Sequence, residues 1–191
     1  FGEFKVHLKM ENDDSQRETS KAVKVCMSYE TMMRDMIQQD FRPIIETIYH
    51  ADRIFVYGTG MVQRTVAKEM KRLFYHGRKN FFDFNGGDEF RALLKELNNR
   101  DLLIMISVSG ERESLLEFVQ KAKIKNVPVI SITERLKNPL AQLSDYNLYI
   151  STTAVEQNLS SVQYKSMTSY FILVEMLMLR YLEYLEEKEE L

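Results

Sequence analysis

Two short loops contain the residue types best suited to binding an anion: residues 58–60 (Gly-Thr-Gly) and residues 107–111 (Ser-Val-Ser-Gly-Glu). Glycine lets backbone N–H groups approach an anion, a helix N-terminus adds partial positive charge, and hydroxyl groups add donors. These properties favour a phosphate site. The local sequence equally allows a structural role, in which the glycines make a tight turn and Ser107 and Ser109 cap the following helix.

A dinucleotide site is the alternative chemistry for the first loop. The Rossmann fingerprint requires G-x-G-x-x-G after a strand and an acidic residue about 20 positions further on. Gly58 and Gly60 fit, but Gln63 or Arg64 stands where the third glycine belongs, and Asp83 is a possible ribose ligand. The fingerprint gives no role to the serine-rich loop, so the sequence favours a phosphate site over a dinucleotide site.

The elements that must position both loops alternate regularly along the chain. Strands are predicted at 54–57, 80–84, 102–106, 127–132 and 147–150. Helices are predicted at 61–74, 90–97 and 113–125, with a short turn of helix at 139–143. Near-continuous apolar strands joined by helices indicate a parallel sheet buried on both faces. Ligands of such sheets bind beyond the carboxyl ends of the strands, where both loops are expected.

Further helices are predicted at the two ends of the chain, at 17–39, at 43–49 and at about 158–186. The first and the last have apolar residues on more than one side, which indicates that they are covered on more than one side. A second copy of the chain is the most economical cover, so the pattern predicts a homodimer. The pattern does not distinguish a dimer from a tetramer.

The composition of the 191-residue chain excludes several classes of protein. Twenty-six Lys and Arg against 28 Asp and Glu give a net charge of −2, without the basic excess of a protein held to DNA by phosphate contacts. Cys26 is alone, and His7, His50 and His76 are too far apart to suggest a metal site. No apolar run approaches the roughly 20 residues of a membrane span. We therefore expect a cytoplasmic protein with no membrane partner, metal or cofactor.

The chain resembles the SIS (sugar isomerase) domain, a phosphosugar-binding fold, over about residues 52–184. The resemblance rests on an ordered set of motifs: the two loops, then 130–133 (Ile-Ser-Ile-Thr) before 138–141 (Asn-Pro-Leu-Ala). It implies an α/β fold, a three-layer αβα sandwich with a five-stranded parallel sheet of the flavodoxin-like SIS type, plus long N- and C-terminal helices. Residues 1–5 and the helix after them also resemble the end of the DNA-binding domain and the connecting helix of RpiR-type transcriptional regulators.

This resemblance divides the chain at about residue 16. Residues 1–16, which include the polar run 11–15, are expected to be the remnant of an upstream helix-turn-helix domain and its linker, since the chain begins at Phe1. Residues 17–191 are expected to be the SIS phosphosugar-binding domain. DNA would then be bound by the missing N-terminal domain and not by this chain.

The resemblance also implies a set of ligand-binding residues. The family pattern is G-x-G-x-S in the first loop and S-x-S-G-x-T in the second. The implied set is Gly58, Thr59, Gly60, Ser107, Val108, Ser109, Gly110, Arg112, Thr133 and Glu156. Val62 replaces the first-loop serine and cannot donate a hydrogen bond. Arg112 replaces the second-loop threonine, and three roles are open to it. It binds the phosphate, or it fills the pocket while forming an ion pair with Glu111 or Glu113, or it is solvated.

Three residues outside the loops have a functional and a structural interpretation. Glu156 resembles the acid that SIS domains often place near the sugar, but it is equally an exposed loop glutamate. Thr133 either reaches the same crevice or serves the turn after its strand. Lys165, expected in the first turns of the last helix, either adds charge to the phosphate site or is solvated.

The leading hypothesis for function is a phosphosugar-sensing effector and dimerisation domain of an RpiR-type transcriptional regulator, in which ligand binding shifts the two subunits relative to one another. One alternative is an aldose-ketose isomerase for sugar phosphates, which needs a base beside the sugar and offers Glu156 for that role. A second alternative is a dimerisation module that has lost its ligand, as Val62 and Arg112 would allow. The identity of the sugar, and whether it induces or relieves repression, are not indicated by the sequence.

Overall fold

The computed structural model describes residues 20–134, 137–156 and 163–189. The predicted linker and remnant at 1–16 lies outside these residues, so that division of the chain stays a prediction. Within the described part, the chain alternates strands and helices as the apolar pattern predicts. None of the helices in this part combines the length and the apolar character needed to cross a bilayer.

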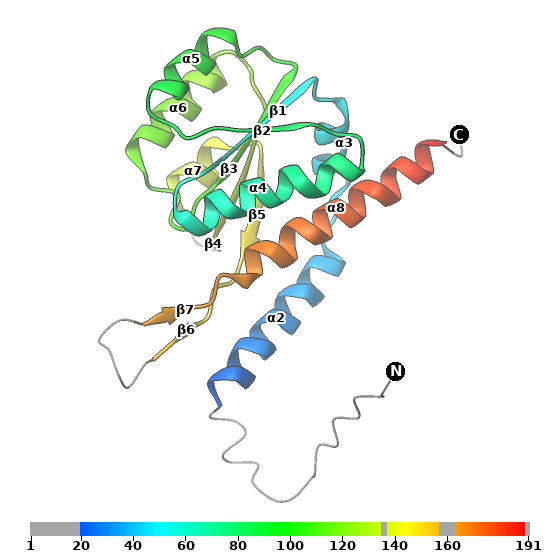
Figure 1. Cartoon of the computed structure of the whole chain (residues 1–191), viewed down its shortest axis with the longest axis vertical. Coiled ribbons are helices and arrows are strands. Elements are labelled where there is room, and N and C mark those ends of the chain that lie inside the picture. The colour runs from blue at the N-terminus through cyan, green and yellow to red at the C-terminus, as the bar shows by residue number, and fades with distance from the viewer. Residues whose placement is uncertain (1–19, 135–136, 157–162, 190–191) are drawn as a thin grey trace, which may run out of the picture.

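Five parallel strands form the central sheet (Figure 1). They are β1 (Arg53–Gly58), β2 (Phe81–Asp83), β3 (Asp101–Ile106), β4 (Val129–Glu134) and β5 (Tyr146–Ile150), in the order β2-β1-β3-β4-β5. Every residue of the central strand β3 is buried, as expected for a parallel strand covered on both faces. The predicted five-stranded parallel sheet is therefore confirmed, and the observed strand ends differ from the predicted ones by at most two residues.

Helices cover both faces of the sheet. Side chains of α2 (Lys21–Gln38), α3 (Arg42–His50), α4 (Met61–His76) and α8 (Thr168–Glu189) share one apolar core with Ile54, Ile104 and Ile130 of the sheet. Residues of α5 (Asp88–Glu96), α6 (Glu113–Ile124) and α7 (Pro139–Leu143) share a second core with Leu103 and Met105. Because adjacent residues of a strand face opposite sides of the sheet, the two cores are separate and the fold is the predicted three-layer sandwich.

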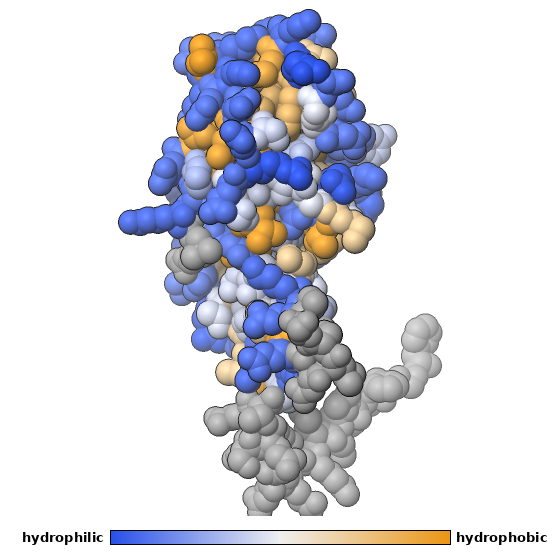
Figure 2. All heavy atoms as spheres, turned by 90° about the vertical axis from the view of Figure 1, so that its left-hand side faces the viewer, coloured by the Kyte–Doolittle hydropathy of each residue, from blue (hydrophilic) through white to orange (hydrophobic). Residues whose placement is uncertain are grey.

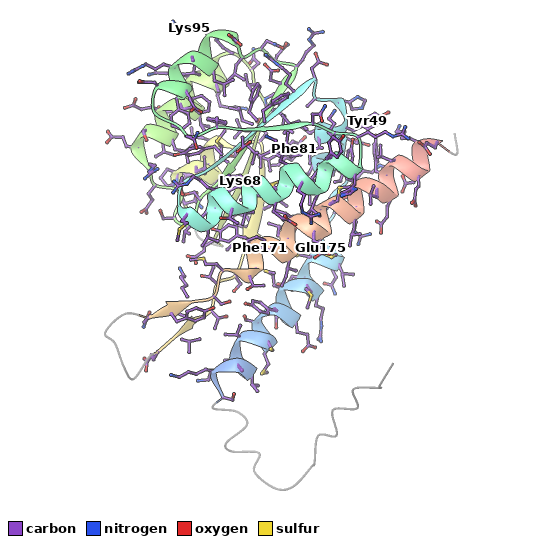
Figure 3. All side chains as sticks on the ribbon, in the orientation of Figure 1. Tyr49, Lys68, Phe81, Lys95, Phe171 and Glu175 are labelled. Atoms are coloured by element: carbon purple, nitrogen blue, oxygen red, sulfur yellow. The ribbon has the colours of Figure 1, made fainter. Side chains whose placement is uncertain are left out.

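Aromatic contacts join the edge strand β2 to the first core. The Phe81 ring lies 4.5 Å from the Phe74 ring of α4, centroid to centroid, and Figure 3 shows Phe81 among the side chains beside α4. The Phe74 ring in turn lies 5.3 Å from Tyr181 of α8. This packing holds α4, which begins at the first loop, between the sheet and α8.

The predicted start of the last helix is wrong. Helix α8 begins at Thr168, and β6 (Ala154–Val155) pairs with β7 (Tyr164–Lys165) as a short antiparallel arm. The Ser166 N–H donates to the carbonyl oxygen of Thr153 (3.0 Å), so it is not available to a helix that would start at about residue 158. This pairing joins residues that are distant along the chain, and counting apolar periodicity cannot detect it. Residues 157–162 lie outside the described part.

Helix α2 lies beyond the sheet, next to the arm (Figure 1). The Thr153 hydroxyl donates to Ser28 Oγ (2.6 Å), and the Tyr29 hydroxyl is hydrogen-bonded to Ser166 Oγ. Of its apolar side chains α2 buries Met32 and Met36, whereas it exposes Val23, Met27, Met33 and Ile37. By contrast, the side of the molecule that carries α5 and α6 is mainly hydrophilic, with small separate apolar patches (Figure 2).

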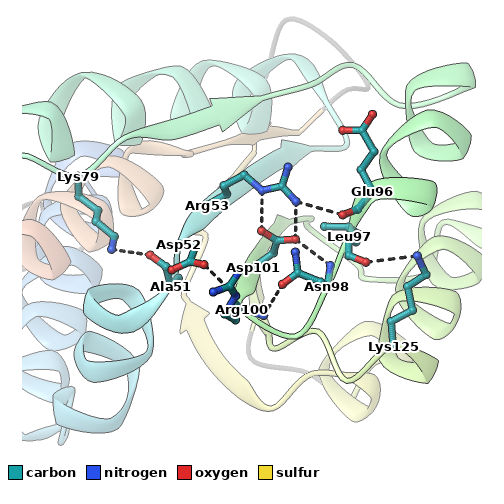
Figure 4. Close-up of polar contacts among 10 residues, drawn as sticks. All are labelled: Ala51, Asp52, Arg53, Lys79, Glu96, Leu97, Asn98, Arg100, Asp101 and Lys125. Atoms are coloured by element: carbon teal, nitrogen blue, oxygen red, sulfur yellow. Dashed lines mark hydrogen bonds and ion pairs between the residues drawn. The ribbon is translucent and has the colours of Figure 1, made fainter.

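An ion pair at the amino ends of the strands fixes β1 against β3. Arg53 Nε donates to Asp101 Oδ1 (2.7 Å) and Arg53 Nη2 to Asp101 Oδ2 (2.8 Å), and the Asp101 carboxylate is fully buried (Figure 4). Hydrogen bonding to Asp101 is the main reason that the pKa of Arg53 is raised. This pairing aligns Arg53 with Asp101, and hence Gly58 with Ile106 at the carboxyl ends.

Candidate functional site

The two loops identified in the sequence lie side by side at the carboxyl edge of the sheet. Strands β1 and β3 are neighbours, but α4 and α6 leave them toward opposite faces, so a crevice opens between the two chain segments. A cleft of about 470 Å³ lies there, within the range of small-molecule sites. Its lining residues are Thr59, Gly60, Gln63, Ser107, Val108, Ser109, Glu111 and Arg112.

The first loop turns tightly because helix α4 starts immediately after β1. A Cβ on Gly58 would lie 2.2 Å from the backbone carbonyl carbon of Gln63, so only glycine allows this close approach. The Thr59 N–H donates to the Ile106 carbonyl oxygen (3.0 Å), which continues the β1–β3 pairing into the loop. The first loop is thus held directly against the second.

The second loop is closed by Ser107. This buried hydroxyl oxygen accepts from the Gly110 N–H (3.1 Å), and Thr59 Oγ1 donates to it across the cleft (3.4 Å). Gly110 has a φ of +66°, and a Cβ on it would lie 2.1 Å from Asn138 Oδ1. Ser109, two residues after Ser107, is exposed in the cleft. The loop therefore has a fixed backbone and one outward-facing hydroxyl.

Both helices that begin at the cleft have N-termini without a side-chain cap. The N-cap residues are Gly60 for α4 and Arg112 for α6, and neither makes a side-chain capping hydrogen bond. The first N–H groups of a helix have no partner within the helix, and together with the helix dipole they favour a bound anion. Ser107 and Ser109 therefore do not cap α6, because the N-cap position is occupied by Arg112.

Arg112 bridges the mouth of the cleft. Its Nη1 donates to the Tyr57 hydroxyl (3.1 Å) and to the Thr59 carbonyl oxygen (3.2 Å). Tyr57 is itself fixed by the Phe84 and Phe90 rings, whose centroids lie 5.3 and 5.0 Å from its own. The guanidinium group is thus exposed but oriented, and Tyr57 is a positioning residue that the sequence pattern did not single out.

The structure brings eight residues to the cleft but not every residue implied by the resemblance. Gly58 and Gly110 shape the loops from behind without lining the cleft. Thr133 is fully buried and accepts a hydrogen bond from Asn138 Nδ2 (3.0 Å). Glu156 is exposed just after β6, and Lys165 in β7 forms an ion pair with Glu134. None of these three lines the cleft in this chain.

Val62 and Asp83, which the sequence hypotheses also considered, contact residues outside the cleft. Val62, at the family's serine position, is half-buried against the core shared by α4 and α8. Asp83, the possible ribose ligand, binds Lys71 Nζ (2.8 Å), and this hydrogen bond lowers the pKa of Asp83. In the described residues no three His, Cys, Asp or Glu side chains gather as a metal site would require.

Two lining residues, Gln63 and Glu111, are absent from the set of ligand-binding residues that the resemblance implies. Gln63 is 4% exposed and lies in the first turn of α4. In the dinucleotide fingerprint, Gln63 is one of the two residues that stand where the third glycine belongs. A polar residue in the first turn of a helix that follows a glycine-containing loop was the available signal.

Comparisons with known proteins agree with this architecture. The SIS domain model matches residues 47–180. The HTH-type transcriptional regulator GlvR of Bacillus subtilis is 30% identical over 189 residues, which are 99% of this chain and 74% of GlvR. These matches cover the strands, both loops and the last helix.

Solved structures share the fold. The sugar isomerase domain of an RpiR transcription factor from Sphaerobacter thermophilus superposes with a TM-score of 0.70 at 21% identity, covering 90% of this chain and 99% of that domain. NanR of Vibrio vulnificus, solved in complex with ManNAc-6P, gives a TM-score of 0.71 at 20% identity, covering 93% of this chain and 67% of NanR. The chain thus belongs to the SIS domain family and is a relative of the HTH-type transcriptional regulator GlvR.

Proposed function

We propose that this chain is the phosphosugar-sensing effector and dimerisation domain of an HTH-type transcriptional regulator, DNA being bound by a separate helix-turn-helix domain. The observation that carries the proposal is the convergence of two uncapped helix N-termini and the Ser109 hydroxyl on one cleft. Backbone N–H groups, a hydroxyl and the Arg112 guanidinium together supply the donors that a phosphate dianion requires.

A sugar phosphate is the ligand class that this cleft suits. Phosphate would bind at the helix ends, while the neutral lining residues Thr59, Gln63 and Val108 would face an uncharged group attached to it. The related fold of NanR was solved with ManNAc-6P bound, which supports this class without naming the sugar for this chain.

A sensor accounts for the described cleft better than an isomerase does. Isomerisation requires a base at hydrogen-bonding distance from the carbon-bound proton that moves. Glu156, the acid offered by the resemblance, is exposed at the end of β6 and does not line the cleft. Glu111 is the one carboxylate in the lining, and it is an exposed residue.

A chain of polar contacts supports transmission from the sheet edge to α2. Glu134, at the carboxyl end of β4, binds Lys165 of the arm and accepts from the Thr152 hydroxyl. Thr153, directly before the arm, in turn donates a hydrogen bond to Ser28 of α2. A ligand that shifts the edge of the sheet would therefore also shift α2, which leads toward the N-terminal segment.

The first test is ligand-dependent thermal stability. The chain is melted with hexose 6-phosphates, the matching free hexoses and inorganic phosphate. A sensor should melt at a higher temperature with at least one sugar phosphate, because a ligand bound only by the folded state stabilises it. No shift with any of these compounds would contradict the sensor proposal and favour a dimerisation module without a ligand.

Ser109→Ala tests the position of the phosphate. If the hydroxyl donates to bound phosphate, the variant should lose about 1–3 kcal/mol of binding free energy, measured by calorimetric titration. Ser114→Ala, an exposed serine of α6 outside the cleft lining, is the matched control and should bind as the parent chain does. Equal affinities of the two variants would mean that the phosphate binds elsewhere.

The isomerase alternative is tested by incubating the chain with an aldose phosphate. Release of ketose phosphate would favour the isomerase over the sensor.

A further inference from the structure

The floor of the cleft holds a buried polar side chain that the phosphate does not need. Gln63 is 4% exposed, yet it is among the residues that line the cleft. Its amide oxygen lies against the first loop, since a Cβ on Gly60 would be 2.3 Å from Gln63 Oε1. The amide is therefore packed beneath the loop, beside the space that a ligand would occupy.

Behind Gln63 lies a hydroxyl group without a hydrogen-bond partner. Tyr170 of α8 is fully buried, and within the described residues its hydroxyl is the one buried side-chain polar atom with no hydrogen bond. Burial raises the pKa of Tyr170 to about 12, while the neighbouring Gln63 amide acts in the opposite direction. The amide thus lies close to the hydroxyl without the geometry of a hydrogen bond. A buried unsatisfied hydroxyl costs stability and calls for a functional explanation.

We propose that Gln63 is a specificity-determining residue, which donates from its amide nitrogen to an oxygen of the sugar and accepts the Tyr170 O–H at its amide oxygen. This inference rests on the proposed phosphosugar function and names the residue that reads the sugar rather than the phosphate. A glutamine amide has two N–H donors and one acceptor oxygen, so one side chain can satisfy both neighbours at once. Rotation of the amide toward the ligand would give Tyr170 the partner it lacks.

The substitution at Val62 supports this assignment. The resemblance places a serine there, whereas Val62 packs into the core and has no hydrogen-bonding group. The next residue, Gln63, brings a longer polar side chain to the same turn of α4. Because a neutral amide pairs with hydroxyl or carbonyl oxygens, it selects among sugars by the oxygen they present. A ligand without that oxygen would leave a buried polar group unpaired, which strongly disfavours its binding.

The test compares sugar and phosphate binding in one variant. Gln63→Met keeps nearly the same size but removes both polar atoms, and Gln120→Met, at an exposed position of α6, is the matched control. Calorimetric titration uses ManNAc-6P, glucose 6-phosphate and inorganic phosphate. We expect Gln63→Met to lose tenfold or more in affinity for the hexose 6-phosphate that the parent chain binds, with its inorganic phosphate affinity unchanged. Ser109→Ala should weaken both.

The outcomes separate this inference from the proposed function. If the parent chain binds neither of these two nor any hexose 6-phosphate of the thermal screen, the proposed function fails and the role of Gln63 fails with it. If the parent chain binds one of them and Gln63→Met binds it equally well, or loses sugar phosphate and inorganic phosphate alike, only the role of Gln63 is overturned.

Tyr170→Phe supplies a readout that a merely structural role would not change. Without ligand, the variant should melt at or above the temperature of the parent chain, because it lacks the unsatisfied hydroxyl. With the bound hexose 6-phosphate, its stabilisation should be smaller than that of the parent chain, because the ligand no longer provides Tyr170 with a partner. Equal ligand-induced shifts in the two proteins would contradict the coupling of Tyr170 to the ligand.

Discussion

At the scale of single residues, the two serines of the second loop have different surroundings although they are two positions apart. Ser107 is buried, and its oxygen accepts from both the Gly110 N–H and the Thr59 hydroxyl. Ser109 is exposed in the cleft. The first hydroxyl maintains the shape of the loop, and the second is available to a ligand.

Ser107→Ala should therefore affect folding, whereas Ser109→Ala should not. Loss of the Ser107 oxygen leaves the buried Gly110 N–H without its acceptor, which we expect to lower the free energy of unfolding by about 1–3 kcal/mol. Ser109→Ala should change it by less than about 0.5 kcal/mol, as for other surface substitutions. Urea denaturation of both variants measures the difference. Equal stability of the two would mean that Ser107 does not hold the loop.

At the scale of elements, the alignment of β1 with β3 depends on charges at the end of the sheet opposite the cleft. The Arg53–Asp101 pair is bidentate and its carboxylate is fully buried, whereas the neighbouring Asp52–Arg100 pair (3.0 Å) is exposed on both sides (Figure 4). The two pairs therefore differ in burial within the same few residues, which makes them a matched comparison.

Asp101→Asn should destabilise the chain much more than Asp52→Asn. Removing the buried charge leaves Arg53 without its partner, and we expect a loss of about 2–4 kcal/mol, below the upper range for buried pairs because Arg53 is partly exposed. The exposed pair should contribute at most about 1 kcal/mol. Thermal or urea unfolding at pH 7 gives both values. Similar losses in the two variants would contradict the role of burial.

The sequence predicted the elements well where apolar runs are continuous and fully buried, as in 102–106 and 127–132. It located both loops because glycine and serine follow such runs directly. It did not predict the β6–β7 arm, whose two-residue strands depend on long-range pairing. It also did not predict that Gln63 would be buried in the cleft or that Asn138 would donate a hydrogen bond to Thr133, because both depend on tertiary packing.

At the scale of the whole molecule, the expected homodimer remains a prediction, and α2 is the element on which it can be tested. Met27 and Ile37 of α2 are 61% and 62% exposed, and Leu179 of α8 is 47% exposed. Apolar side chains that are exposed in one chain and gathered on long helices are typical of surfaces that pack against a second copy.

Met27→Glu combined with Ile37→Glu should reduce the mass in solution to that of one chain, because charged groups cannot be buried without partners. Light scattering after size-exclusion chromatography measures the mass. Ile124→Glu is the control, since Ile124 is 81% exposed on α6, away from α2, and should leave the mass unchanged. A doubly substituted chain that keeps the mass of a dimer would place the interface on another surface.

Different residues of the cleft hold the backbone and face the ligand, and this separation limits which positions can change during evolution. Gly58, Ser107 and Gly110 hold the backbone, while the side chains at positions 109, 111 and 112 face outward from it. Natural drift or a randomised library at these three outward positions can therefore change how tightly the phosphate is bound while most variants still fold.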